Sequence, residues 1–205
     1  MTETELERWQ KRFSAPDYIF GTAPNAFLKS KVGLLRKGQT ALAIADGEGR
    51  NGVFLAEQGL DVLSIDFSTA GQAKARALAA ARGVHMRVEL ADVIDWAYPP
   101  AAFDVVAAVF IQFADPAQRE KIFAGIKRTL KPGGLLLMQG YRPKQLEYKT
   151  GGPPFLDHLY TRELLERAFD DFASIDIVEH DSVIAEGTHH VGMSALIDLV
   201  ARKSI

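Results

Sequence analysis

A glycine-rich turn and a later carboxylate predict a site for an adenosine-containing cofactor. Gly47, Gly49 and Gly52 follow a strand-like run, and a second strand-like run ends at Asp66. Glycine has no Cβ atom, so a ligand can approach the backbone closely at such a turn. An acid at the end of the next strand can accept hydrogen bonds from ribose hydroxyls. The same spacing matches the dinucleotide-binding fingerprint, so the turn alone leaves the cofactor open.

The bulk composition restricts the classes of function. With 205 residues, 47% of them hydrophobic, and a net charge of −2, the chain is expected to form one globular domain with a substantial core. No cluster of Lys and Arg is present, which argues against a nucleic-acid partner. The chain has no cysteine, so disulfides and thiolate metal sites are excluded. The polar N-terminus and the lack of a long apolar run predict a cytoplasmic protein without a membrane partner.

Strand-like and helix-like segments alternate through the first two thirds of the chain, which is typical of a doubly wound parallel sheet. Strands are predicted at residues 40–45, 62–66, 86–90, 103–110 and 135–139. Helices are predicted at residues 24–35, 51–58 and 161–169, after Ser68 and after Asp115.

The C-terminal part breaks this alternation. Residues 174–183 and 194–203 are both strand-like, with no helical segment between them, and would pair as an antiparallel hairpin. We therefore predict an α/β fold with a doubly wound, seven-stranded, mostly parallel sheet. The sheet ends in the antiparallel hairpin, and helices cover both of its faces.

Five motifs in this order resemble those of the class I S-adenosylmethionine-dependent methyltransferases. The matching motifs are residues 46–49, Asp66, Asp92, residues 103–110 and residues 131–134. The resemblance implies a Rossmann-like fold, S-adenosylmethionine as the cofactor, and methyl transfer. The short chain with an N-terminal helix is similar to the small, lid-bearing members of the tellurite-resistance and thiopurine type.

The resemblance also predicts how the single domain is divided. Residues 1–37 would form an N-terminal helical lid, and residues 38–140 the cofactor-binding core. Residues 141–205 would supply the acceptor-site loop, a helix and the closing hairpin.

The resemblance implies a set of cofactor contacts. Asp66 would bind the ribose and Phe67 would pack on the adenine, whereas Asp46 would face the methionine part. Asp66 and Asp92 could instead cap a helix and a turn. The predicted cofactor-binding residues are Asp46, Gly47, Gly49, Asn51, Asp66, Phe67, Asp92, Val93 and Phe110.

The first strand departs from the family pattern at two positions. Where the family usually has an acid and, two residues later, a glycine, this chain has Ala43 and Ala45. Ala43 cannot orient the cofactor through a carboxylate, so Asp46 is the nearest substitute. The alternative is a degenerate relative that has lost cofactor binding.

The acceptor site is expected outside the shared core, in residues 9–25, 141–154 and 186–190. Histidine can act as a base or, when protonated, hold an anion near neutral pH. The histidines of the last segment could equally lie in an exposed turn without a function. The candidate catalytic residues are Arg12, Tyr18, His189 and His190, and no metal site is predicted.

We therefore expect S-adenosylmethionine-dependent methyl transfer to a small molecule by in-line displacement. A thiol, a chalcogen oxyanion, or a small carboxylate or hydroxyl compound would suit as the acceptor, and the enzyme would be a monomer or a homodimer. Two other functions remain open. One is an NAD-dependent oxidoreductase, although no Tyr-x-x-x-Lys motif is recognisable. The other is a non-catalytic module that binds S-adenosylmethionine.

Overall fold

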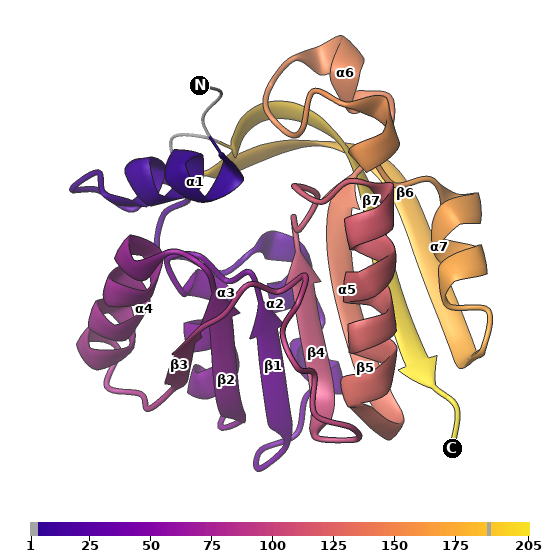
Figure 1. Ribbon diagram of the computed structural model, residues 1–205, viewed down its shortest axis with the longest axis horizontal. Coiled ribbons are helices and arrows are strands. Elements are labelled where there is room, and N and C mark those ends of the chain that lie inside the picture. Colours follow the sequence, from indigo (N-terminus) through magenta and orange to yellow (C-terminus); the bar gives the residue numbers. More distant parts are fainter. Residues whose placement is uncertain (1–3, 188–189) are drawn as a thin grey trace.

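One seven-stranded sheet runs through the whole molecule (Figure 1). The structure is a computed structural model, and it describes residues 4–187 and 190–205. The strand order is β3-β2-β1-β4-β5-β7-β6; β1 to β5 are parallel, and β7 is antiparallel to both of its neighbours. The predicted fold class is thus confirmed. The strands are β1 (Thr40–Ile44), β2 (Asp61–Asp66), β3 (Arg87–Leu90), β4 (Phe103–Val109), β5 (Leu130–Tyr141), β6 (Phe172–Glu186) and β7 (His190–Lys203).

Helices cover both faces of this sheet (Figure 1). They are α1 (Glu5–Phe13), α2 (Ala26–Ser30), α3 (Arg50–Glu57), α4 (Thr69–Ala81), α5 (Pro116–Thr129), α6 (Gln145–Tyr148) and α7 (Arg162–Ala168), with 3₁₀ turns η1 (Val32–Leu34) and η2 (Leu156–His158). In β1, Leu42 and Ile44 pack with residues of α5 and α7, whereas Ala41 packs with α2, α3 and α4. Successive strand residues point to opposite faces, so the apolar run is buried on both sides. No helix among the residues described is long and apolar enough to cross a bilayer.

The sequence predicts some helix boundaries correctly and one helix wrongly. Ser68 and Asp115 accept hydrogen bonds at the N-termini of α4 and α5, as expected for N-cap residues. The single helix predicted over residues 24–35 is instead two short pieces, α2 and η1. Gly33 lies in the second piece, and a glycine in a helix interior costs about 1 kcal/mol relative to alanine, which favours the early end of α2.

The strands around the C-terminal hairpin are longer than predicted. In β5, Leu130 pairs with Phe103 and Leu135 pairs with Val105, so the residues between Leu130 and Leu135 bulge out of the ladder. Gly133, at φ 71°, lies in this bulge. β6 and β7 pair from Phe172 to Glu186, and their distal part extends beyond the end of β5.

The distal part of the hairpin, α1 and α6 lie together beyond the carboxyl ends of the parallel strands (Figure 1). In open α/β sheets, ligands bind at this edge, near the point where the strand order reverses. Here β1 has β2 on one side and β4 on the other, so the reversal lies at the end of β1.

Candidate active site

Asp66, the last residue of β2, is a buried carboxylate at this edge. It is 4% exposed, and its two oxygens accept hydrogen bonds from the backbone N–H groups of Gly47 (2.9 Å) and Ser68 (2.8 Å). Burial raises the pKa of Asp66 to about 6, because these hydrogen bonds offset only part of the desolvation. Each carboxylate oxygen has a second lone pair, so Asp66 can still accept hydrogen bonds from a ligand.

The side chain of Asp46 links the end of the glycine turn to β2 through hydrogen bonds. Its carboxylate accepts from the backbone N–H of Gly52 (3.1 Å to Oδ2) and from the hydroxyl of Ser64 (2.8 Å). Burial raises the pKa of Asp46 to about 7. These contacts tie the first turn of α3 to β2. The expected contact between Asp46 and the methionine part of a cofactor stays a prediction.

Two non-glycine residues at this edge have left-handed backbone conformations. Ala45, at φ 47°, stands where the resembled family has glycine, and Phe110, at φ 55°, directly follows β4. The ring of Phe110 stacks on Tyr141, with 4.7 Å between the centroids. Such conformations are costly for residues with a Cβ atom and cluster at functional sites.

A small inner pocket of about 80 Å³ lies over the turn. Its aromatic walls come both from the N-terminal segment and from the core. Gly47 is required here because a Cβ atom at this position would lie 2.8 Å from the ring of Phe13. The lining residues are Trp9, Phe13, Phe20, Ala45, Asp46, Gly47, Arg50, Asn51, Asp66, Phe67, Val109, Phe110 and Phe113.

Other predicted cofactor residues lie elsewhere. Gly49 permits helix packing, because its Cβ would lie 2.6 Å from that of Ala75 in α4. Asp92 is exposed and accepts a hydrogen bond from the backbone N–H of Ile94 (2.9 Å). Val93 is fully buried in the core. Gly49, Asp92 and Val93 are not among the residues that line the inner pocket.

Arg50, the first residue of α3, was not among the predicted site residues. It is 6% exposed, and its Nη2 lies 2.7 Å from Oε2 of Glu186. Its Nη1 is buried and has no hydrogen-bond partner among the described residues. An unsatisfied buried donor is costly, so a ligand carboxylate in the inner pocket would satisfy it. Its position directly after the glycine turn is the sequence feature that could have indicated a contact with the cofactor.

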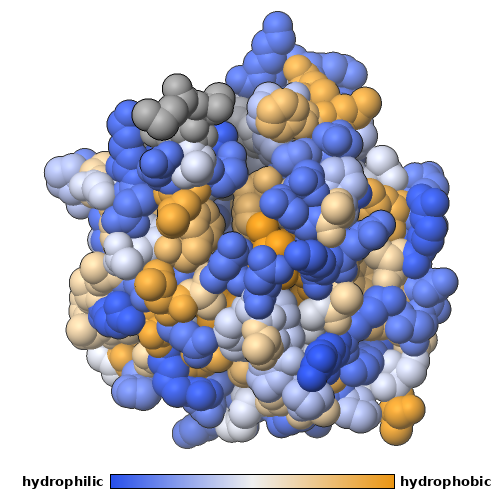
Figure 2. All heavy atoms as spheres, in the orientation of Figure 1, coloured by the Kyte–Doolittle hydropathy of each residue, from blue (hydrophilic) through white to orange (hydrophobic). Residues whose placement is uncertain are grey.

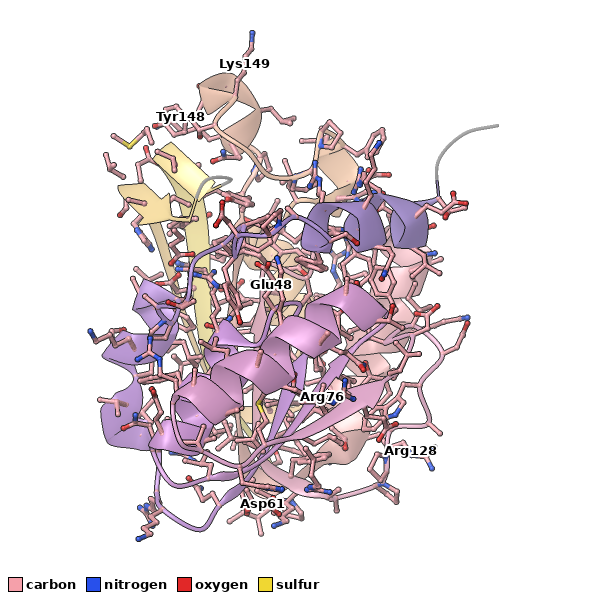
Figure 3. All side chains as sticks on the ribbon, turned by 90° about the vertical axis from the view of Figure 1, so that its left-hand side faces the viewer. Glu48, Asp61, Arg76, Arg128, Tyr148 and Lys149 are labelled. Atoms are coloured by element: carbon pink, nitrogen blue, oxygen red, sulfur yellow. The ribbon has the colours of Figure 1, made fainter. Side chains whose placement is uncertain are left out.

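A buried ion pair holds the N-terminal segment onto the core. Glu48, which is 3% exposed, lies between the core and this segment (Figure 3) and pairs with Lys74 of α4 at 2.7 Å. The ammonium group of Lys74 also donates to the backbone carbonyl of Asp17 (2.6 Å). Tyr18 donates to the carbonyl of Lys74 (3.0 Å) and lines neither the inner pocket nor the outer cavity described below. This geometry gives Tyr18 an anchoring role.

The tip of the hairpin docks on the same segment. A Cβ atom on Gly187 would lie 2.3 Å from the carbonyl oxygen of Ile19, so the two backbones are in close contact. Glu186 accepts from Nδ2 of Asn25 at 3.2 Å in addition to its pair with Arg50. Two predicted candidates belong to this tip. His189 and the side chain of His190 lie outside the described residues, and His190 is described only as the first residue of β7.

A larger outer cavity of about 450 Å³ adjoins the inner pocket. The two share Trp9, Phe20, Phe110 and Phe113 as a common wall. In Figure 2, apolar atoms lie in a recess beside the N-terminal helix. The lining residues are Glu5, Arg8, Trp9, Arg12, Phe20, Phe110, Gln112, Phe113, Tyr141, Gly151, Gly152, Pro153, Pro154, Phe155 and His158.

Of the predicted catalytic residues, Arg12 lies in the wall of the outer cavity. Its guanidinium group is 5.0 Å from the centroid of the Trp9 ring. His158 lines the same cavity and was not among the predicted histidines, which were His189 and His190. No group of three or more potential metal ligands occurs within residues 4–187 and 190–205.

Comparisons with known proteins agree with this architecture. Residues 41–134 match the family model described as a methyltransferase domain. The core of this chain is thus similar to a methyltransferase domain. The match covers the glycine turn, Asp66 and β4.

A curated relative and two solved structures extend the comparison. The demethylmenaquinone methyltransferase of Thermus thermophilus is 32% identical over 138 residues, which are 66% of this chain and 55% of that protein. The chain thus spans about half the length of the curated relative that it matches.

The solved structures show the fold. One, solved for the conversion of a disulfide bond into a thioacetal group during echinomycin biosynthesis, has a TM-score of 0.77 and 20% identity over 98% of this chain and 93% of that one. Another is a Haemonchus contortus phosphoethanolamine N-methyltransferase with S-adenosylhomocysteine. Its TM-score is 0.72 at 19% identity, over 96% of this chain and 58% of that one. At such identities the likeness concerns the fold, and function depends on the site.

Proposed function

We propose that this protein is an S-adenosylmethionine-dependent methyltransferase that acts on a small molecule. The observation that carries the proposal is that the inner pocket and the outer cavity adjoin and share four aromatic lining residues. The inner pocket contains the glycine turn, Asp66 and Arg50, and the outer cavity has the size of a small-ligand site. A cofactor in the first and an acceptor in the second would meet at the shared wall.

The side chains of the inner pocket fit the cofactor. When bound, S-adenosylmethionine supplies an electrophilic methyl group on a sulfonium centre. Asp66 would accept from the ribose hydroxyls, and the buried Nη1 of Arg50 would donate to the carboxylate of the methionine part. Phe67 and Phe110 would pack on the adenosine. Contacts from Asp92 and Val93 to the adenine would require the ligand to extend beyond the pocket.

The outer segments would orient the acceptor and exclude water. Orientation of two reactants in one site can contribute about 7–11 kcal/mol to lowering a barrier. Trp9 and Phe20 belong to the proposed lid, residues 1–37, and both line the shared wall. The loop at residues 151–155 also lines the outer cavity. This arrangement supports the resemblance to small, lid-bearing methyltransferases, with an acceptor smaller than a macromolecule.

Replacement of Asp66 by alanine tests the cofactor site. Loss of one or two charge-assisted hydrogen bonds should weaken S-adenosylhomocysteine binding by roughly 10- to 150-fold for each bond of about 1.5–3 kcal/mol. The measurement is isothermal titration calorimetry. Asp61→Ala is the matched control, because Asp61 begins the same strand at its opposite, exposed end.

Circular dichroism should show that both variants fold, and Asp66→Asn provides a more conservative change at the site. If the unmodified protein binds no S-adenosylhomocysteine, or binds NADH instead, the proposed function is wrong. Unchanged affinity in Asp66→Ala would exclude the assigned role of this carboxylate.

A further inference from the structure

His158 of η2 lies in the wall of the outer cavity, outside the cofactor pocket. Its side chain is 13% exposed, and its ring lies 5.1 Å from that of Phe155, which lines the same cavity. The following inference about His158 rests on the proposed function and concerns the acceptor half of the site.

One hydrogen bond determines the tautomer of His158. Its Nδ1 lies 3.3 Å from the backbone carbonyl oxygen of Gln112. A carbonyl oxygen can only accept, so Nδ1 must carry the proton. In the neutral ring the lone pair is then on Nε2. A histidine with one nitrogen held by a carbonyl and a lone pair on the other is suited to take up a proton.

The position of His158 is itself fixed by Gln112. Gln112 is 4% exposed, and its side-chain amide donates to the carbonyls of Tyr141 (2.8 Å) and His158 (3.2 Å). Gln112 also follows Phe110, a residue of the shared wall, by only two positions. The imidazole is therefore tied to the segment that separates the acceptor from the cofactor.

Charged groups around His158 come from three elements. Asp157, in η2 itself, has a side chain that is 64% exposed, and its Oδ1 lies 4.0 Å from Nε2 of His158. Arg119 of α5 donates a hydrogen bond to the backbone carbonyl of Asp157 (2.5 Å). The lining of the cavity also includes Glu5, Arg8 and Arg12 of α1, and Glu5 pairs with Arg8 at 2.5 Å. Guanidinium groups form strong, charge-assisted hydrogen bonds with carboxylates, so Arg8 and Arg12 make that wall suited to an anionic group.

We propose that the outer cavity takes a planar aromatic acid carrying a hydroxyl group, and that His158 is the general base for that hydroxyl. The aromatic rings of the cavity would pack on the planar body, and the arginines of α1 would bind the carboxylate. The hydroxyl O–H bond breaks, and its proton goes to Nε2 of His158. The oxygen would keep this electron pair and use it to form a bond to the methyl carbon. The bond between that carbon and the sulfonium sulfur would break, and the sulfur would keep its electron pair in the leaving group, S-adenosylhomocysteine. The imidazolium then releases the proton to solvent.

A pair of acceptors that differ in one atom tests the role of His158. 4-Hydroxybenzoate must lose a proton to react, whereas the thiol of 4-mercaptobenzoate is already ionised near neutral pH. We expect both to be methylated, with S-adenosylhomocysteine release as the measurement. In His158→Gln, kcat should fall by about 10²- to 10⁴-fold for the hydroxyl acceptor. For the thiol acceptor it should change by less than about threefold, because no proton is transferred.

His85→Gln is the control, because His85 is exposed in the loop before β3 and should behave as the unmodified protein. With 4-hydroxybenzoate, the rate of His158→Gln should recover as the pH is raised and the acceptor ionises in solution. Equal losses for both acceptors would show a positioning role and overturn the assignment of His158 as the base. If S-adenosylhomocysteine binds but neither acceptor is methylated, the acceptor class is wrong and the cofactor assignment stands.

Two measurements do not depend on turnover. ¹⁵N chemical shifts of the His158 ring should show a protonated Nδ1 and a free Nε2 in the neutral state; the opposite tautomer would overturn the proposal. Calorimetry with 4-hydroxybenzoate in the presence of S-adenosylhomocysteine should show binding that Arg12→Gln weakens by about tenfold or more. Unchanged binding in Arg12→Gln would contradict the placement of the carboxylate.

Discussion

Ala45 is the residue that departs most clearly from the pattern of the glycine turn. Its φ of 47° is a conformation that a Cβ atom makes costly, by roughly 1–2 kcal/mol. Glycine could adopt this backbone conformation without that cost. The strain lies next to the inner pocket, which Ala45 lines.

Ala45→Gly should therefore stabilise the protein. Relief of the left-handed strain outweighs the added flexibility of the unfolded chain, so we expect the free energy of unfolding to rise by about 1 kcal/mol. Chemical denaturation measures the change. Ala41→Gly in β1, the strand that Ala45 directly follows, should instead destabilise, because it removes a buried methyl group from an ordinary strand position. A loss of stability in Ala45→Gly would contradict the strain argument.

Half-buried Asp46 and buried Asp66 give the same edge of the sheet two carboxylates with raised pKa values, about 7 and about 6. Desolvation is the first cause for both, and the charge of Asp66 further raises the pKa of Asp46. The folded protein therefore holds these protons more tightly than the unfolded chain. The stability that this contributes is present at low pH and is lost as the pH rises through the folded-state pKa.

Replacement of Asp46 by asparagine should reveal this linkage. The neutral amide keeps an acceptor for Gly52 and Ser64 but removes the titration. The unfolding free energy of the unmodified protein, relative to that of Asp46→Asn, should fall by on the order of a few kcal/mol between about pH 4 and pH 7. Urea denaturation of both proteins at several pH values measures this difference. The other carboxylates titrate in both proteins, so their contributions cancel. A difference that is independent of pH would show that Asp46 is not desolvated.

At the scale of elements, the site is built by two segments that are far apart in the sequence. The segment between α1 and α2 meets the turn between β6 and β7, and Gly187 permits the contact with Ile19. Arg50 joins α3 to the same turn through Glu186. The β6–β7 hairpin thus forms one edge of the sheet, and its turn contacts the N-terminal segment that lines the inner pocket.

Gly187→Ala should undock these two segments. A matched control exists in Gly83→Ala, because both glycines have a φ of 65° but a Cβ atom on Gly83 would meet nothing within 4 Å. Gly83→Ala should cost about 1 kcal/mol from backbone strain alone. Gly187→Ala should cost more and should speed hydrogen exchange in residues 17–25, as measured by mass spectrometry. Equal effects of the two variants would show that the contact does not hold the segment.

For the whole molecule, the closed arrangement limits access to the cofactor site. The inner pocket holds only about 80 Å³, whereas ligand sites usually enclose about 300–1,000 Å³. Phe13, which is 4% exposed, packs directly on Gly47. We therefore infer that the N-terminal segment must move for a cofactor to bind. This motion would break the contacts of the segment with the Glu48–Lys74 ion pair and with Glu186, and their loss contributes to its free-energy cost.

S-adenosylhomocysteine should change the stability and the dynamics of the whole domain. At a concentration of about 100 times its Kd, a ligand that binds only the folded state adds about 2.7 kcal/mol, so the melting temperature should rise. Hydrogen exchange in residues 4–25 should slow at the same time, because the segment closes over the ligand. Asp66→Ala should show a smaller rise in melting temperature and less slowing of exchange at the same ligand concentration, because its affinity for the ligand is weaker. A stabilised protein with unchanged exchange in this segment would contradict its role as a lid.

Much of the fold was predictable because it depends on local patterns. Apolar runs buried on both faces, the caps at Ser68 and Asp115, and the strand-rich C-terminus each carry their own signal. The helix over residues 24–35 was predicted wrongly, since Gly33 favoured an early break. In the site, the glycine turn and Asp66 were recognisable from their spacing, whereas the role of His158 was not. Nothing near His158 in the sequence indicates that Gln112 will hold its ring.

The sequence by itself determined the order of the elements, the methyltransferase-like motifs and the position of the cofactor edge, because these follow from periodicity and short spacings. The tertiary structure decided which side chains meet. In the folded protein, Asp46 accepts a hydrogen bond from Ser64, and Tyr18 donates one to the carbonyl of Lys74. Arg50 lines the inner pocket and His158 lines the outer cavity. Such contacts join residues that are distant along the chain, and their hydrogen bonds and burial exist only after the elements have packed.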